Sequence, residues 1–92
     1  MAKRAFTKQG EFFVYILQCQ DGTFYTGHTN DLAKRLKLHN KGKGARYTRG
    51  RRPVELVWHK EYKYFKRAFL EESRIKKLTR KQKKKLIDEY RG

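Results

Sequence analysis

The feature that most constrains the fold is an unbroken apolar run, Phe12-Phe13-Val14-Tyr15-Ile16-Leu17. Its β-branched and aromatic residues are typical of a strand, and both alternating faces of that strand would be apolar. Such a strand is stable only when both of its faces are covered. We therefore predict a central strand here, in a chain of 92 residues that is long enough for one domain with one core.

The segment after this strand predicts a hairpin followed by a helix. Asp21-Gly22 is typical of a two-residue turn, and strand-forming residues resume over 23–27. Thr29-Asn30 then offers capping side chains for a helix that has Asp31 in its first turn and extends to Gly42.

The second half of the chain predicts a loop, a third strand and two further helices. Residues 41–52 are rich in glycine, lysine and arginine without an apolar period, which indicates an exposed basic loop. A strand is expected from Val54 to near Tyr62, and a helix over 65–78. Thr79 and Gln82 have the spacing of a capping box for a terminal helix that includes Leu86 and Ile87.

These elements predict an α+β fold, in which a small three-stranded antiparallel sheet is flanked by helices in the order β-β-α-β-α-α. We expect residues 11–90 to form a single domain. Residues 1–10 are polar and basic without periodicity, and we expect them to form a flexible N-terminal arm.

The charge of the chain indicates a polyanionic partner. Lys and Arg number 25 against 9 Asp and Glu, which gives a net charge of +16. The charge is spread along the whole chain between aromatic residues, which favours nucleic acid over a membrane surface. The longest apolar run is too short to cross a bilayer, and we expect an intracellular protein without a small-molecule cofactor. Cys19 is the only cysteine, which excludes an internal disulfide.

Three charged or titratable residues occupy positions that would normally be apolar. Arg35 and His39 follow the apolar spacing of the first predicted helix, and Glu72 shares the stripe of Phe65 and Phe69, which we expect in the core. Desolvating a charge costs several kcal/mol, on the order of magnitude known for buried ions, so each needs a partner or a function. A structural ion pair between Arg35 and Glu72 is one interpretation, and a catalytic site is the other.

The sequence resembles the GIY-YIG nuclease superfamily, in particular its small stand-alone bacterial members. The two name-giving triplets correspond to Val14-Tyr15-Ile16, which lacks the glycine, and Tyr25-Thr26-Gly27. The family's arginine corresponds to Arg35 and its glutamate to Glu72, and the likeness covers residues 12–87. Triplets, arginine and glutamate in register over most of the chain are a specific signal.

The resemblance implies a metal-dependent endonuclease that hydrolyses phosphodiester bonds in DNA, with single-stranded or branched DNA as the candidate substrates and with DNA favoured over RNA. Glu72 would bind one Mg²⁺ or Mn²⁺, and Arg35 would bind a phosphate oxygen. Tyr25 would orient or deprotonate the attacking water with the help of Tyr15. His39 would assist this tyrosine or the phosphate, or it would be a helix-surface histidine.

Further residues are predicted to contact the nucleic acid, either from the basic loop or beside the second triplet and the later helix. Tyr47 would contact a phosphate or a base, or would pack on the sheet instead. A different function would use the same charges, namely a catalytically inactive nucleic-acid-binding module. The predicted contact residues are His28, Lys43, Arg46, Tyr47, Arg49, Lys76 and Lys77.

Overall fold

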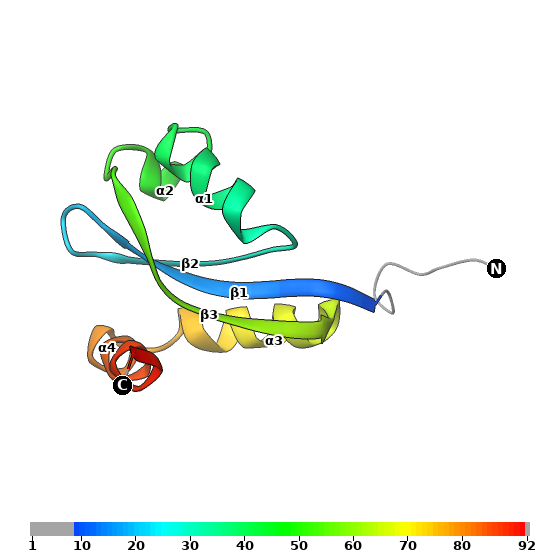
Figure 1. Ribbon diagram of the computed structural model, residues 1–92. Helices are drawn as coiled ribbons and strands as arrows, with labels where there is room; N and C mark the ends of the chain where they lie inside the picture. The colour runs from blue at the N-terminus through cyan, green and yellow to red at the C-terminus, as the bar shows by residue number, and fades with distance from the viewer. Residues whose placement is uncertain (1–8, 92) are drawn as a thin grey trace.

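The computed structural model describes residues 9–91, and side-chain burial over 11–91. Residues 1–8 of the predicted arm lie outside the described residues, whereas Gln9 and Gly10 belong to the first strand. Figure 1 shows the elements, which are β1 (Gln9–Cys19), β2 (Phe24–Thr29), α1 (Leu32–Asn40), α2 (Arg46–Arg49), β3 (Val54–Tyr64), α3 (Phe65–Lys76) and α4 (Arg80–Arg91).

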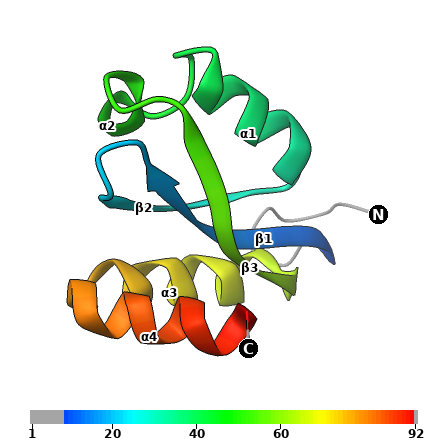
Figure 2. The same ribbon diagram turned by 60° about the vertical axis from the view of Figure 1, so that its left-hand side comes forward.

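The three strands form one antiparallel sheet in the order β2-β1-β3, which confirms the predicted α+β fold and the central position of the apolar strand. The helices α1 and α2 cover one face of this sheet, and α3 and α4 cover the other (Figures 1 and 2). No helix within residues 9–91 has the length and apolar character needed to cross a membrane.

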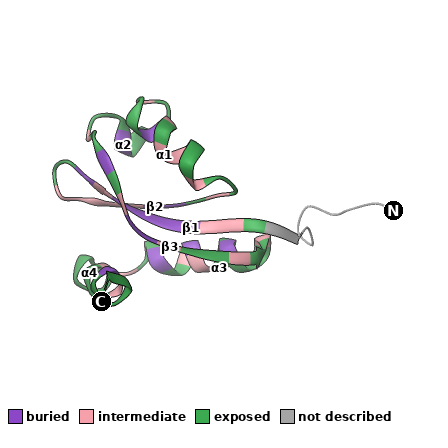
Figure 3. Ribbon diagram, in the orientation of Figure 1, coloured by how far each residue is buried: buried purple, intermediate pink, exposed green. Residues whose placement is uncertain are grey.

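Each face of β1 contributes to a separate core. Val14 and Ile16 pack beneath α3 and α4 together with Trp58, whereas Tyr15 and Leu17 pack on the α1 side. The buried residues are concentrated on β1 and β3, between the two helical layers (Figure 3). Burial on both faces explains why the consecutive residues 14–17 are all apolar.

A bulge in β3 departs from the simple alternation predicted for this strand. Leu17 pairs with Leu56 and Ile16 pairs with Trp58, so Val57 is an extra residue on the β3 side. Val57 and Trp58 consequently both belong to the core under α3 and α4.

Two local details differ from the sequence prediction. The β1–β2 turn is longer than the predicted two residues. It is closed by a hydrogen bond that Cys19 N–H donates to the Thr23 carbonyl (2.8 Å), and Gly22 within it adopts a φ of 86°. At the start of α1 the cap is Asp31, whose carboxylate accepts from Lys34 N–H at 3.1 Å, and not Thr29-Asn30.

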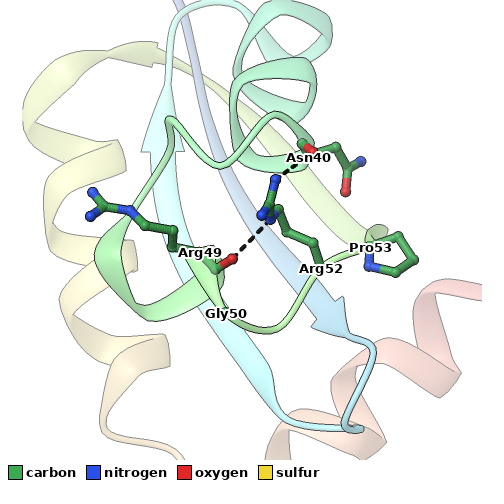
Figure 4. A pocket seen from close by; sticks show the side chains of 5 residues that line it. All are labelled: Asn40, Arg49, Gly50, Arg52 and Pro53. Carbon is green, nitrogen blue, oxygen red and sulfur yellow. Dashed lines mark hydrogen bonds between the residues drawn. The ribbon is translucent and has the colours of Figure 1, made fainter.

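The predicted basic loop is held by a network of hydrogen bonds and contains the short helix α2. Arg52 donates to the carbonyl oxygens of Arg49 (2.8 Å) and Asn40 (3.4 Å), which ties the ends of α1 and α2 together (Figure 4). Asn40 also bonds both the N–H and the carbonyl of Val54 at the start of β3. The segment has no apolar period of its own. Hydrogen bonds to these backbone groups hold it in a defined shape instead.

The capping box before α4 is confirmed. Thr79 N–H donates to Gln82 Oε1 (2.9 Å), and Gln82 N–H donates to Thr79 Oγ1 (3.2 Å). The helix continues beyond the predicted Ile87 and ends at Arg91, and Ile87 is buried against the sheet.

Substituting the cap should destabilise the domain measurably. We expect Thr79→Ala to lower the free energy of unfolding by about 1 kcal/mol, because one backbone N–H at the start of α4 loses its acceptor. Urea unfolding measures this loss. Lys81→Ala, an exposed change in the same helical turn, is the control and should remain within about 0.5 kcal/mol of the parent protein. Equal effects of the two substitutions would contradict a capping role.

Candidate active site

The site is organised around Tyr15, whose ring passes over Gly27 in the edge strand β2. The two residues are direct cross-strand partners. A Cβ atom at position 27 would lie 2.6 Å from the Tyr15 hydroxyl oxygen, closer than atoms of the two groups can approach. The last residue of the second triplet is therefore a glycine because the Tyr15 ring occupies the place of its side chain.

A cluster of rings surrounds the Tyr15 hydroxyl on the α1 face. The Tyr15 oxygen lies 3.0 Å from His39 Nε2, and the ring centroids of Tyr25 and His39 are 5.4 Å apart. Tyr47 from α2 stacks on Tyr25 with centroids 6.0 Å apart, and the Arg51 guanidinium lies 4.1 Å from the Tyr47 centroid. Tyr47 thus packs on a tyrosine of the sheet, yet its side chain keeps an exposed part facing solvent.

His39 is completely buried, so the interpretation of a helix-surface histidine is wrong. Burial, and then the charge of Arg35, lower the pKa of His39 from 6.5 to about 4. The imidazole is therefore neutral at physiological pH. His39 is the buried residue of α1, and together with the hydrogen bonds of Asn40 to Val54 it holds the end of α1 on the sheet.

Arg35 lies one helical turn before His39 and points toward the same tyrosine. Its Nε is buried, and within residues 9–91 it has no hydrogen-bond partner. Burial raises the pKa of Tyr15, while the Arg35 guanidinium opposes this shift because it stabilises the phenolate. A guanidinium with an unused buried donor is well suited to bind an anionic oxygen.

Glu72 reaches the site from α3, on the other side of the edge strand. The residue is 8% exposed. His28 Nδ1 lies 2.8 Å from its Oε1, and Lys76 Nζ lies 3.2 Å from its Oε2. These are its ion-pair partners among the described residues, so the predicted structural pair with Arg35 is wrong.

Arg35 and Glu72 belong to helices that cover opposite faces of the sheet (Figure 1). The edge strand β2 contacts both helical layers, since His28 of this strand lies 2.8 Å from the Glu72 carboxylate of α3 and the Tyr25 ring lies 5.4 Å by centroid from His39 of α1.

The residues predicted to contact nucleic acid fall into two groups. Lys43, Arg46, Arg49 and Lys77 are exposed, and Arg49 points away from the bracing Arg52 in Figure 4. His28 and Lys76 instead hold the Glu72 carboxylate, as their distances to its oxygens show.

The expectation that Phe65 and Phe69 lie in the core is wrong, because Phe69 is 50% exposed and the partly buried Phe65 belongs to neither core cluster. The two rings stack on each other with centroids 6.2 Å apart, and Phe65 also contacts His28 edge-on. The side of α3 that faces the sheet carries Ala68, Glu72 and Ile75, so Phe69 lies beside that contact rather than within it.

Gly44 and Thr48 are site residues that the sequence analysis did not single out. Thr48 is completely buried, with its hydroxyl 2.8 Å from His39 Nδ1. A Cβ atom at Gly44 would lie 2.3 Å from the same nitrogen. In the sequence these two positions appear only as a small polar residue and a glycine inside a strongly basic segment. No local sequence pattern links either of them to His39.

The donor set fits a hard cation that keeps most of its own water. Among residues 9–91 no group of three or more His, Cys, Asp or Glu side chains gathers as a metal cage. Mg²⁺ does not need such a cage, because one or two carboxylates with water ligands are sufficient. Glu72 is the carboxylate at this position, and Lys76 or His28 would have to release one of its oxygens.

A side chain at position 27 should disturb the site and the fold together. We expect Gly27→Ala to lower the free energy of unfolding by about 1–3 kcal/mol, because the new methyl group overlaps the Tyr15 ring. Denaturant unfolding measures this. Gly50→Ala is the matched control, since nothing lies within 4 Å of its Cβ position, and should change stability by less than about 0.5 kcal/mol. A neutral Gly27→Ala variant would show that Tyr15 does not need this space.

Buried neutral His39 should make stability depend on pH. The unfolded chain binds the His39 proton near pH 6.5 and the folded chain near pH 4, so the unfolded state takes up more protons between these values. We expect the free energy of unfolding to fall by roughly 2–3 kcal/mol as the pH is lowered through this window.

The measurement is denaturant unfolding at several pH values, with His39→Gln beside the parent protein. The variant should lose this part of the pH dependence. His59→Gln, a change of a partly exposed histidine on β3, should keep it. Identical pH dependence in the parent and His39→Gln would contradict the neutral buried imidazole.

Comparison with known proteins agrees with this geometry. The family model described as the GIY-YIG catalytic domain matches residues 11–85. A UPF0213 protein of Bacillus pumilus is 51% identical over 91% of this chain and 85% of its own length. A UPF0213 protein of Clostridium perfringens is 55% identical over 82% of this chain and 81% of its own length.

Two solved solution structures are also similar. That of a protein from E. faecalis has a TM-score of 0.62 and 39% identity, covering 92% of this chain and 91% of the other. That of a UPF0213 protein from Bacillus halodurans has a TM-score of 0.57 and 44% identity, covering 85% and 83% respectively. With the triplets, the sheet order and the placement of Tyr15 over Gly27, these matches confirm the resemblance, and the chain belongs to the GIY-YIG family.

Proposed function

We propose that this protein is a metal-dependent endonuclease that hydrolyses phosphodiester bonds in DNA, with single-stranded or branched DNA as its substrate. The observation that carries this proposal is the buried Arg35 Nε, which has no hydrogen-bond partner among residues 9–91 and lies in the same cluster as Tyr15, while the buried carboxylate of Glu72 contacts His28 of strand β2. Phosphodiester hydrolysis needs a cation for the phosphate, a ligand for a metal and a polar group near the attacking water. These three residues provide them.

Arg35 is the residue we assign to the scissile phosphate. Its buried Nε is without a hydrogen-bond partner in the described part of the chain, so a phosphate oxygen would satisfy it. The guanidinium is always protonated and its fork geometry suits phosphate oxygens. It would stabilise the negative charge that develops on a nonbridging oxygen.

Tyr25 and Tyr15 are the residues we assign to the attacking water. Their rings lie 6.5 Å apart by centroid on the α1 face, next to His39. A water held by these hydroxyl groups would be oriented for attack on a phosphate bound by Arg35.

We assign the metal to Glu72, because this buried carboxylate lies against His28 of the edge strand β2. A bound Mg²⁺ or Mn²⁺ supplies charge stabilisation for the phosphoryl group and the leaving oxygen. His28 and Lys76 hold the carboxylate in a fixed position until then.

The surface around the site supports a polyanionic substrate. The net charge is +16, and exposed lysines and arginines extend from the basic segment to α4. The partly exposed Tyr47 ring next to Arg51 offers a stacking surface for an unpaired base. Both features favour DNA with unpaired bases near the cut site.

One observation favours a second function, a nucleic-acid-binding module without catalysis. Both carboxylate oxygens of Glu72 already have a partner, His28 on one and Lys76 on the other. In that case Glu72 would serve to orient two basic groups, and no metal would be required.

Replacement of Glu72 separates the two functions. If the protein is a nuclease, Glu72→Gln should lower the cutting rate by at least about 100-fold while binding of DNA is retained or tightened, because a negative charge and a metal ligand are lost. Cleavage of labelled single-stranded, branched and duplex DNA in Mg²⁺ or Mn²⁺ measures this. Glu71→Gln is the matched control, since the neighbouring carboxylate is paired with Arg74 (2.8 Å) and should leave cutting unchanged.

Two results would contradict the proposal, each in a different way. A parent protein that binds these DNAs but cuts none of them, nor RNA, in either metal would overturn the nuclease function and leave the binding module. Cutting that survives in Glu72→Gln at the parental rate would overturn the assignment of Glu72 as the metal ligand.

A further inference from the structure

His39 is the part of the site whose surroundings are most completely defined. Its Nε2 faces the Tyr15 hydroxyl at 3.0 Å. Its Nδ1 faces two groups of the basic segment, the Thr48 hydroxyl at 2.8 Å and the Ala45 backbone N–H at 3.4 Å. The imidazole therefore connects the segment before α2 to the tyrosine at the centre of the site.

The backbone N–H decides which ring nitrogen carries the proton. A backbone amide cannot rotate its proton away or exchange its role for that of an acceptor, whereas the Thr48 hydroxyl can turn freely. A proton on Nδ1 would point at the Ala45 N–H, so two donors would face each other. With the proton on Nε2, Nδ1 accepts from the Ala45 N–H, and the Thr48 hydroxyl turns its single proton to Nδ1 and away from the Ala45 carbonyl, which lies 3.0 Å from the hydroxyl oxygen.

Gly44 is what allows the backbone to reach the ring. A Cβ atom at this position would lie 2.3 Å from His39 Nδ1 and 2.8 Å from His39 Cα. The second of these neighbours is backbone and cannot move aside. Only a glycine permits Ala45 N–H and Thr48 to approach the imidazole from the same side.

We propose that the segment Gly44–Thr48 holds His39 as its Nε2–H tautomer, so that His39 donates a hydrogen bond to the Tyr15 oxygen and Thr48 is a positioning residue for Tyr15. The consequence for the reaction rests on the proposed nuclease function. His39 then acts as a donor to Tyr15 and does not take the Tyr15 proton.

This arrangement has a chemical effect on Tyr15. A hydrogen bond donated to a phenol oxygen favours its ionised form and opposes the effect of burial, which raises the pKa of Tyr15. Because His39 fills one acceptor site of the oxygen, the hydroxyl proton of Tyr15 points elsewhere and is available to a water or a phosphate oxygen. The neutral state of His39 suits this role, since a single ring proton is committed to Tyr15.

The tautomer can be measured without any nuclease activity. In protein labelled with ¹⁵N at histidine, long-range ¹H–¹⁵N NMR spectra distinguish a protonated ring nitrogen from an unprotonated one. At neutral pH we expect His39 Nε2 to be protonated and Nδ1 to be unprotonated in the parent protein. A protonated Nδ1 in the parent protein would overturn the proposal, whatever the protein does to DNA.

Thr48 is tested by two substitutions of different chemistry. Thr48→Ser keeps the hydroxyl and should keep the parental tautomer. Thr48→Val keeps the shape but removes one of the two donors to Nδ1, so the averaged Nδ1 resonance should move part of the way toward the protonated range, while the Ala45 N–H still opposes full protonation. If Thr48→Val has the parental NMR spectrum of His39, Thr48 does not position the ring. Should Thr48→Val fail to fold, the parent protein and Thr48→Ser still decide the tautomer.

The same variants test the consequence for catalysis. We expect Thr48→Val to lower the cutting rate by roughly 10- to 100-fold with unchanged DNA binding, and Thr48→Ser to retain most of the activity. Parental cutting by Thr48→Val, with an altered tautomer, would show that the tautomer does not matter for the reaction. A parent protein that shows the Nε2–H tautomer but cuts nothing would refute the nuclease proposal and leave the tautomer assignment in place.

Discussion

The burial of β1 on both faces is the constraint on which the rest of the structure depends. A strand that is apolar on both sides has to be covered twice, and a small chain can only do so with helices above and below a narrow sheet. The sheet has three strands, so its edge at β2 is only one strand away from the centre. Residues of both helical layers therefore contact this edge strand, Glu72 of α3 through His28 and His39 of α1 through Tyr25, and the candidate site lies there.

Glycines make this convergence possible at two points. Gly27 leaves room for the Tyr15 ring to extend over the edge strand, and Gly44 leaves room for the loop backbone to reach His39. In both cases a ring from another element occupies the space where a side chain of the glycine position would lie. The glycines therefore matter for close approach of neighbouring groups, and neither has a positive φ.

The electrostatics of the site contrast with those of the surface. A chain with a net charge of +16 has many cations available, yet Glu72 is one of its few buried charged groups. Burying a carboxylate is costly unless it is paired, and His28 and Lys76 provide the pairing. On the opposite face Arg35 keeps a buried donor that no described residue satisfies. The site therefore holds one stabilised anion and one cation with unused binding capacity.

The sequence by itself determined the central strand, the hairpin, the capping box of Thr79 and Gln82, and the presence of charged residues on apolar stripes. These features depend on neighbours one to four residues apart, which periodicity and capping preferences describe. Only the tertiary structure decided that Glu72 pairs with His28, that Thr48 and Gly44 contact His39, and that Phe69 lies outside the core. Those outcomes depend on how the helices pack around the sheet edge and on the Val57 bulge, since the partners come from different elements and no local pattern encodes which side chains will meet.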